Sequence, residues 1–469
     1  MYEKRNPDEL ELKNFYQPFG GKMNPENRWI KMAEMIPWEK LEEKYASQFK
    51  AIGRGAKKVR MALGALLIQQ KFGFSDEETV TQIIENPYYQ YFIGLSEYQG
   101  KKPFDSSMMV YFRKRVKPEM LEEVNNALCI KKKTEKAKDK KKDDDPPPEN
   151  RGKLLLDATC TPADIKFPTD LNLLNESREK LEVMIDESFS RGELGGKRPR
   201  TYRRVARKNY LTAAKNKKIS EGKLKAAIRK QLQYVKRDLG YLERADPTKL
   251  TKKQGKDLAV IRKLYEQQKE MFEKQIHSIP DRIVSISQDH VRPIIRGKAG
   301  AGVEFGAKVS ISVLNGFAFA DKISWDNYNE GTILKEHVQK YLERFGCYPK
   351  AVIVDKIYRT RENQAFCKAH GIRLSGPALG RPKMDERERE KIKVQEKKDI
   401  SVRNAVEGSF GNGKRKYGLN LIMAKLPDTS ETVIRLNFVL MNIERKLRFL
   451  LRLFFVPVFY RYSELKSCA

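Results

Sequence analysis

The sequence is short of the residues that build zinc modules, disulfide frameworks and membrane spans. Its five cysteines are scattered, at Cys129, Cys160, Cys347, Cys367 and Cys468, with no C-x-x-C pair. This spacing argues against both a zinc module and a disulfide framework. No run approaches about 18 apolar residues, and the first residues lack the apolar segment of a signal peptide. We therefore expect a soluble protein of the reducing cytoplasm that does not contact a membrane.

Acidic residues are also fewer than basic ones. The 469 residues include 94 lysines and arginines but only 62 aspartates and glutamates, a formal net charge of +32. Basic side chains that displace counterions from DNA gain salt-dependent affinity, so nucleic acid is the first partner to consider. A ribosome-like or merely basic protein is the alternative that charge alone leaves open. The length predicts two or three domains.

Three acidic residues stand out against this basic background. Residues 153–157 and 351–355 are apolar runs typical of buried strands, and each closes on an aspartate, Asp157 and Asp355. Glu407 lies in residues 402–415, whose spacing indicates a helix. Taken alone, an aspartate that closes a strand is more often a turn or cap residue. Together in one basic chain, the three acids predict a shared site, with Asp157 at a sheet edge.

Carboxylates suit the chemistry of phosphodiester cleavage and joining. In-line displacement places negative charge on the attacking and leaving oxygens, and two Mg²⁺ ions roughly 3.5–4 Å apart stabilise both. Mg²⁺ prefers oxygen ligands and keeps several waters, so few carboxylates suffice. We expect two Mg²⁺ ions per site, with Mn²⁺ able to substitute. Other possible ligands are Asp164, Asp170, Glu176, Asp289 and Asp321. His290, His337 and His370 are isolated, which favours surface or helix roles.

The sequence blocks around these acids resemble those of DDE transposases of the insertion-sequence-five family. The similar blocks are residues 157–179, 292–298, 354–363 and 403–411, in the order that the family keeps. Residues 61–71 and 91–95 resemble the N-terminal domain of InsH-type transposases. The resemblance covers nearly the whole chain.

The resemblance implies a ribonuclease-H-like catalytic core with Asp157, Asp355 and Glu407 as its metal-binding triad. The family also has a tyrosine, arginine, glutamate and lysine pattern around the third acid. Arg403 and Lys414 match that pattern, whereas Ile400 stands at the tyrosine position. Lys414 and Arg415 would contact the scissile phosphate beside the metal. The role of a tyrosine at position 400 is therefore in doubt, but the metal site is not.

The N-terminal part, residues 1–130, has a helical pattern. Apolar residues recur at helical spacing over 57–70, and Ser75 with Glu78 predicts a capping box that opens a second helix. Helix, turn and helix in a basic context are compatible with a DNA-binding domain, although the pattern alone slightly favours a plain helical bundle. The resemblance shifts the balance toward DNA. Candidate phosphate contacts are Arg54, Lys57, Lys58 and Arg60.

The rest of the chain predicts an α/β core that is interrupted by a helical insertion. Residues 131–150 are charged and proline-rich and predict a linker. We assign 151–175 and 281–425 to the core, a mixed sheet with flanking helices, and 426–469 to a C-terminal helix that packs on it. Residues 176–280 predict an antiparallel helical hairpin with a coiled-coil seam. The basic stretch 197–208 that leads into it suits DNA and a solvated surface equally.

Within the core, the expected order is strand, strand, strand, helix, strand, as a ribonuclease-H fold requires. Strands are predicted at 282–287, 303–313 and 316–325, and the last two are joined at Asn315-Gly316, a strong hairpin signal. A helix follows over 332–345, before the strand that carries Asp355. Pattern and resemblance agree on this arrangement.

The function that these observations predict is a DNA transposase of a bacterial insertion sequence. It would bind terminal inverted repeats as a dimer or higher oligomer, cleave the element ends and join their 3′-hydroxyls to target DNA. It would reside in the cytoplasm with the nucleoid. Two alternatives remain: a ribonuclease-H-like metal-dependent nuclease without strand transfer, and a basic DNA-binding protein without catalysis.

Overall fold

The computed structural model describes residues 2, 15, 21–50, 55–129, 149–244, 247–298, 301–376 and 386–467, the last seventeen of them, 451–467, by their backbone alone. The predicted linker at 131–150 falls almost wholly outside these ranges. The described chain forms two units. Unit 1 comprises Met1–Thr161, Lys308–Ser324 and Tyr328–Ala469, and unit 2 comprises Pro162–Ala307 and Trp325–Asn327. The N-terminal helices and most of the sheet therefore belong to the same unit.

Short helices make up the N-terminal part of unit 1. They are α1 (Arg28–Met35), α2 (Trp38–Ala46), α3 (Val59–Phe72), α4 (Asp76–Glu85), α5 (Pro87–Phe92), α6 (Met108–Arg115) and α7 (Pro118–Cys129). The predicted helix over 57–70 is α3, and its apolar residues are almost completely buried. Ser75 caps α4 as predicted, because its hydroxyl accepts the backbone N–H of Glu78 at 3.0 Å.

One mixed sheet holds the strands of the described chain. They are β1 (Lys153–Pro162), β2 (Arg292–Lys298), β3 (Ala301–Leu314), β4 (Phe317–Ser324), β5 (Ala351–Ile353) and β6 (Arg373–Leu374). The order is β2-β3-β1-β5-β6, and β4 pairs with β3. β1 is parallel to β5 and β5 to β6, whereas β3 is antiparallel to β2 and β4. The fold is thus mixed α/β, as expected.

The predicted hairpin between β3 and β4 is confirmed. Leu314 pairs with Phe317 across a two-residue turn, and both turn residues adopt positive φ angles, 52° at Asn315 and 83° at Gly316. Asn and Gly tolerate this left-handed conformation better than other residues, so the dipeptide fixes the turn and the register of the hairpin.

Helices cover one face of the sheet through an apolar cluster. The short helix η6 (Glu330–Ile333) leads into α12 (Leu334–Phe345), which is the helix predicted over 332–345. Leu334 and Val338 of α12 pack against Leu154 and Leu156 of β1. After β5 come η7 (Lys356–Tyr358) and α13 (Arg361–Ala369), which complete the same cluster. The apolar runs of β1 and β5 are buried for this reason.

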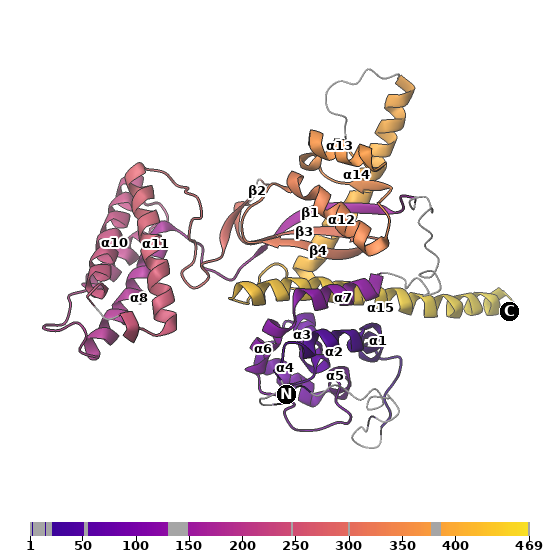
Figure 1. Cartoon of the computed structure of the whole chain (residues 1–469), viewed down its shortest axis with the longest axis horizontal. Coiled ribbons are helices and arrows are strands. Elements are labelled where there is room, and N and C mark those ends of the chain that lie inside the picture. The colour runs from indigo at the N-terminus through magenta and orange to yellow at the C-terminus, as the bar shows by residue number, and fades with distance from the viewer. Residues whose placement is uncertain are drawn as a thin grey trace. The chain divides into compact units, whose positions relative to one another are not determined.

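Two long helices end the chain. α14 (Glu386–Lys416) contacts β5, and α15 (Pro427–Ser467) contacts α7, α3 and β4 (Figure 1). The predicted apolar stripe of α15 is buried at Leu436, Leu440 and Ile443. This helix packs on the sheet, as predicted, and also on the N-terminal helices, so it joins them into unit 1.

One predicted strand is wrong. Residues 282–287 form no strand, and the chain enters the sheet only at β2, from Arg292. Ile283 and Ile286 are buried against the helices of unit 2, while Val284 packs with Ala163 and Val291. Residues 283–286 are all buried, because the segment lies between two apolar clusters.

Unit 2 contains a bundle rather than a two-helix hairpin. Its helices are α8 (Asp170–Ser190), α9 (Arg203–Ala214), α10 (Glu221–Leu242) and α11 (Lys252–Lys274), with the short η5 (Pro247–Lys249) between the last two. The predicted seam residues Leu232, Val235 and Leu239 are buried. However, α8 packs on α10 and α11 and shares their core (Figure 1), and it also contacts α9. It begins at Asp170, before the predicted boundary at 176.

Candidate functional site

The two aspartates come level with each other through the register of β1 and β5. Leu155 pairs with Ile353 where β1 and β5 run parallel. Asp157 lies two residues after Leu155, and Asp355 lies two residues after Ile353. β1 continues past Asp157 to Pro162, so Asp157 lies within a strand and not at its end as predicted. It is instead β5 that ends, at Ile353. Asp355 then caps η7, because its Oδ1 accepts the N–H of Lys356 at 2.7 Å.

Glu407 lies near Asp355 because both contact Arg403, which is on the same helix as Glu407. Arg403 lies one turn before Glu407 on α14. Its Nη1 is 3.0 Å from Oδ1 of Asp355, and its Nη2 is 3.9 Å from Oε1 of Glu407. The Asp355 and Glu407 side chains are 57% and 61% exposed, so this cation and both acids face solvent. One guanidinium therefore draws together the second and third predicted acids.

α14 is held against the sheet on either side of this arginine. Asp399 accepts two hydrogen bonds from Arg373 of β6, at 2.6 and 2.9 Å, and is itself buried. Further along, Val406 is buried, and Gly413 leaves no space for a side chain beside Leu419. The helix does not end at Gly411 or Gly413, so Lys414 and the exposed Arg415 share it with Glu407.

Burial and charge act together on Asp157. Burial raises the pKa of its carboxyl group to about 6, although the hydrogen bond that it accepts from the N–H of Ala158 at 2.8 Å lowers this pKa. The negative charges of Glu330 and Asp355 raise it further, and Arg403 opposes them. All three predicted acids thus lie around Arg403. Glu330, at the start of η6, is a fourth acid that the sequence analysis missed.

Glu330 is paired with a lysine that was also missed. Nζ of Lys308, on β3, lies 2.9 Å from Oε1 of Glu330 and donates to the carbonyl oxygen of Tyr328 at 2.9 Å. Both side chains are largely buried, at 10% and 19% exposure. The sequence does show that Glu330 follows Asn329, a capping residue. That signal predicts a helix start and says nothing about β3, so no local pattern pairs Glu330 with Lys308.

The acids have the chemistry that a divalent metal ion needs. Asp355 and Glu407 are both near one cation, the Arg403 guanidinium, and carboxylate oxygens are the ligands that Mg²⁺ prefers. Within the described residues, no three His, Cys, Asp or Glu side chains are close enough to hold a metal ion as they stand. The acids therefore fit such an ion in type and in general position, and Arg403 would have to give way.

Two family models match the chain. A model described as "Transposase DDE domain" matches residues 352–444, which include Asp355 and Glu407, and one described as "Transposase domain (DUF772)" matches residues 18–115. The chain is also 30% identical over 176 residues to "Uncharacterized protein ORF8 in nfe locus" from Rhizobium meliloti, a stretch that covers 36% of this chain and 81% of that protein. No solved structure matches.

This chain belongs to the DDE transposases. The two family models together support the type that includes insertion sequences four and five, as the sequence blocks predicted. Membership implies a DNA substrate and the use of a divalent metal ion. Among the described helices of the transposase, none has both the length and the apolar content that crossing a bilayer requires.

Three of the other acids of the transposase that could have been ligands are paired elsewhere. Asp170 accepts a hydrogen bond from Arg282, and Asp289 from Lys256, both within unit 2. Asp321 is buried in unit 1, where its oxygens lie 2.9 Å from Nδ1 of His337 and 2.5 Å from Nη2 of Arg344. Buried charges persist when they are paired in this way.

His337 belongs to a buried polar chain behind β1. Its Nε2 lies 2.9 Å from the hydroxyl of Ser310, which in turn is 3.5 Å from the carbonyl oxygen of Asp157. Serine, histidine and aspartate line up as they do in hydrolases, but all three are buried, so no substrate reaches the hydroxyl. His337 therefore has a structural role on α12, as the sequence analysis favoured.

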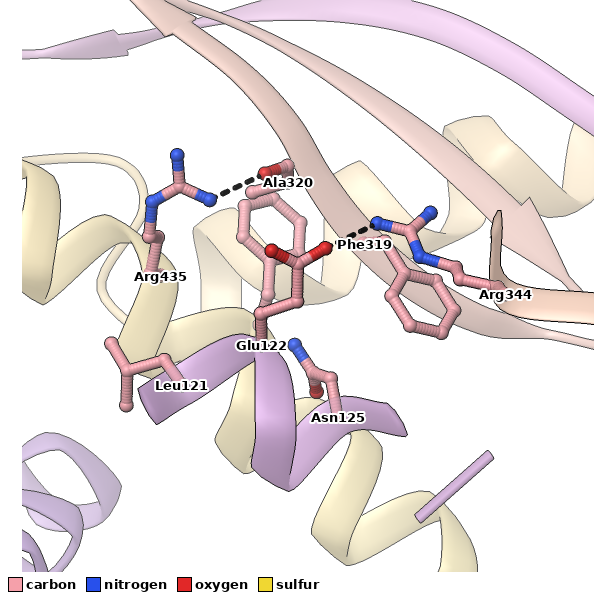
Figure 2. Close-up of a pocket in the computed structure, with 8 residues that line it drawn as sticks. Leu121, Glu122, Asn125, Phe319, Ala320, Arg344 and Arg435 are labelled. Atoms are coloured by element: carbon pink, nitrogen blue, oxygen red, sulfur yellow. Dashed lines mark hydrogen bonds and ion pairs between the residues drawn. The ribbon is translucent and has the colours of Figure 1, made fainter. Parts of the chain in front are cut away.

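This polar chain of the transposase continues to the N-terminal helices. Nη2 of Arg344 donates to Oε1 of Glu122 on α7 at 3.0 Å, and its guanidinium lies over the ring of Phe319. Figure 2 shows these residues around a small pocket, together with Asn125 and with Arg435, which donates to the carbonyl oxygen of Ala320. Among the described residues, those that line this pocket include no predicted site residue. It marks where α7 and α15 meet the sheet.

The predicted DNA contacts of the N-terminal part differ in their surroundings. Arg60 is 6% exposed, and its guanidinium donates to the carbonyl oxygens of Tyr91 and Phe92, so it is used inside the protein. Nζ of Lys57 donates to the carbonyl oxygen of Pro103 at 2.6 Å. Lys58 is partly exposed at the start of α3. Arg54 lies outside the described residues.

Proposed function

We propose that this transposase cuts the ends of a mobile DNA element and joins them to target DNA at Asp157, Asp355 and Glu407. The observation that carries the proposal is the approach of Asp355 and Glu407 to one cation, Arg403, beside a partly buried Asp157. Acids that repel one another gather around a cationic centre only where the fold brings them there. The sheet and α14 do so from three distant parts of the chain.

We also propose that the sheet and its helices form a ribonuclease-H-like core. Two features support this: the path β4-β3-β1-β5-β6, with β1, β5 and β6 parallel, and the position of α12 between β4 and β5 in the sequence. In such a core the first two acids belong to neighbouring strands. The bundle of unit 2 then interrupts the core between β1 and β2.

In this mechanism the three acids would bind the metal ions from different parts of the fold. Bound divalent metal ions, Mg²⁺ by preference and two per site, would activate the attacking oxygen and stabilise charge on the leaving oxygen. Asp157 would hold them from β1, Asp355 from the start of η7 and Glu407 from α14. Arg403 would release the acids and turn toward a DNA phosphate. Lys414 and Arg415, further along the same helix, would contact the backbone on the scissile strand.

Basic side chains elsewhere would bind DNA without reading its sequence. Lys57 and Lys58 remain candidates at the start of α3. In unit 2, Arg204, Arg207 and Lys208 of α9 and Lys215, which follows the helix, line one pocket and are exposed. This surface falls in and beside the predicted basic stretch, and it suits a phosphate backbone. A dimer on paired element ends and an association with the nucleoid remain predictions.

Conservative substitutions of the acids test the proposal. Asp157→Asn, Asp355→Asn and Glu407→Gln should each abolish Mg²⁺-dependent cleavage of DNA that carries the element's ends, and leave footprinted end binding intact. Glu388→Gln is the matched control, because Glu388 is exposed on the same helix as Glu407. Circular dichroism would confirm that each variant is folded. Near-normal cleavage by any one of the three would remove that residue from the triad.

The products distinguish the alternative functions. Joined molecules in an assay with end DNA and a target plasmid identify a transposase that completes strand transfer. Cleavage without joining would identify a nuclease. End binding with no metal-dependent nicking in the wild type would identify a DNA-binding protein that has lost its chemistry. Footprints at two salt concentrations would separate phosphate contacts from base contacts.

A further inference from the structure

A buried ion pair lies beside the candidate site, and the proposed mechanism does not use it. Lys308 and Glu330 are in contact at 2.9 Å and are largely buried. Lys308 comes from β3, two residues before Ser310, whose hydroxyl approaches the carbonyl oxygen of Asp157. Glu330 begins η6. Removing two charges from water costs free energy, and a buried ion pair is weak evidence for stability alone.

Tight packing fixes Glu330 relative to Asp355. A Cβ atom on Gly331, the next residue, would lie 2.6 Å from the carbonyl oxygen of Ile357 in η7. The buried Asn363 joins the same two segments, since its Nδ2 donates to the carbonyl oxygens of Gly331 at 2.6 Å and Tyr358 at 2.8 Å. Asp355 caps η7 from the other end. η6 and η7 therefore form one rigid piece that carries both acids.

We propose that Glu330 is a fourth acidic ligand of the metal site, held in place by Lys308 until a divalent cation replaces the lysine as its partner. This inference rests on the proposed function of Asp157 and Asp355. Lys308 has a second anchor, the carbonyl oxygen of Tyr328, and a third in the Tyr328 ring at 4.8 Å. It can therefore release Glu330 without losing every contact.

Affinity for Mn²⁺ tests the proposal independently of catalysis. Free Mn²⁺ would be measured by electron paramagnetic resonance in titrations of the full chain without DNA. Glu330→Gln should weaken binding on the order of tenfold, as substitutions around metal ligands do. Lys308→Met should strengthen binding, because the competing ammonium group is gone. A purely structural ion pair predicts instead that both variants bind equally well or both bind worse.

The double variant Lys308→Met/Glu330→Gln addresses stability. It leaves no buried unpaired charge, so it should fold as well as the wild type while still binding Mn²⁺ weakly. Wild-type affinity in the double variant, or in Glu330→Gln alone, would overturn the role of Glu330. Asp355→Asn separates the two proposals. If it binds Mn²⁺ as the wild type does, the proposed metal site itself fails, whereas weak binding in Asp355→Asn with normal binding in Glu330→Gln rejects only the fourth ligand.

Discussion

A neutral substitution at Asp238 should stabilise the helical bundle of unit 2, and only at pH values above the ordinary pKa of an aspartate, where the carboxyl group of the unfolded chain ionises. The Asp238 side chain, on α10, has no exposed surface. Its Oδ1 is 3.3 Å from Nη2 of Arg237, and its Oδ2 has no hydrogen-bond partner within the described chain. Burial raises the pKa of Asp238 to about 7. The positive charge of Arg237 lowers this pKa, and the negative charge of Glu182 raises it further.

The expected magnitude follows from the two pKa values of Asp238. The ordinary value of 3.8 applies to the unfolded chain, and about 7 applies to the folded one. Each pKa unit is worth about 1.4 kcal/mol, so ionisation lowers the free energy of unfolding by up to about 4 kcal/mol. Because the folded pKa is the higher one, the stabilisation is complete below pH 3.8 and is lost as the pH rises through about 7. Asp238→Asn should match the wild type at acid pH and exceed it above about pH 8.

Hydrogen exchange of peptides from α8 and α10 would measure this difference locally, with rates corrected for intrinsic exchange at each pH. Asp186→Asn on α8 is a control of opposite sign. Partial burial works against the shift there, but hydrogen bonds from Arg203 and Arg198 hold the pKa of Asp186 below its usual range, so this variant should lose stability at neutral pH. An Asp238→Asn protein that is less protected than the wild type at high pH would refute the reasoning.

Two further substitutions test unit 1. Asp321→Asn removes the carboxylate that pairs with His337 and Arg344 and should lower the free energy of unfolding by about 3–5 kcal/mol, because Arg344 stays buried without its main partner. Urea titrations followed by tryptophan fluorescence measure this loss, and midpoints equal to those of the exposed control Asp428→Asn would contradict it. Gly331→Ala places a Cβ atom 2.6 Å from the carbonyl oxygen of Ile357, so it should shift η7 with Asp355 and reduce DNA cleavage more than end binding. Gly408→Ala, which meets no atom within 4 Å, is its control, and equal cleavage by both variants would rule out this coupling.

Much of the fold could be predicted because its signals are local. Asn315-Gly316 defines a turn through its backbone preferences, and the turn sets the register of β3 and β4. The apolar runs before Asp157 and Asp355 are short and unbroken, as in strands that are buried on both faces. α3 follows from its helical spacing, and the start of α4 follows from its capping residue Ser75. None of these features needs information about distant contacts.

The errors arise where a local pattern has two physical causes. The apolar residues of 282–287 look like a strand, but here Ile283 and Val284 pack in different apolar clusters. The seam of α10 and α11 looks like a hairpin, but α8 supplies part of the same core. Arg60 looks like a phosphate contact because it lies in a basic stretch, yet its guanidinium fills an internal site. Sequence spacing does not say which partner a side chain meets.

At the candidate site, too, the sequence predicts some neighbours of a side chain and not others. Asp157 and Asp355 could be paired from sequence, because two parallel strands with equal offsets bring them level. Glu407 could be placed on a helix, but its meeting with Asp355 depends on Arg403 and on the anchor between Asp399 and Arg373. Glu330 could not be found at all, since only the tertiary fold brings η6 against β3 and η7. Asp355, Glu407 and Glu330 thus lie against cations of their own chain, so a metal ion that binds these acids would replace Arg403 or Lys308 as their partner.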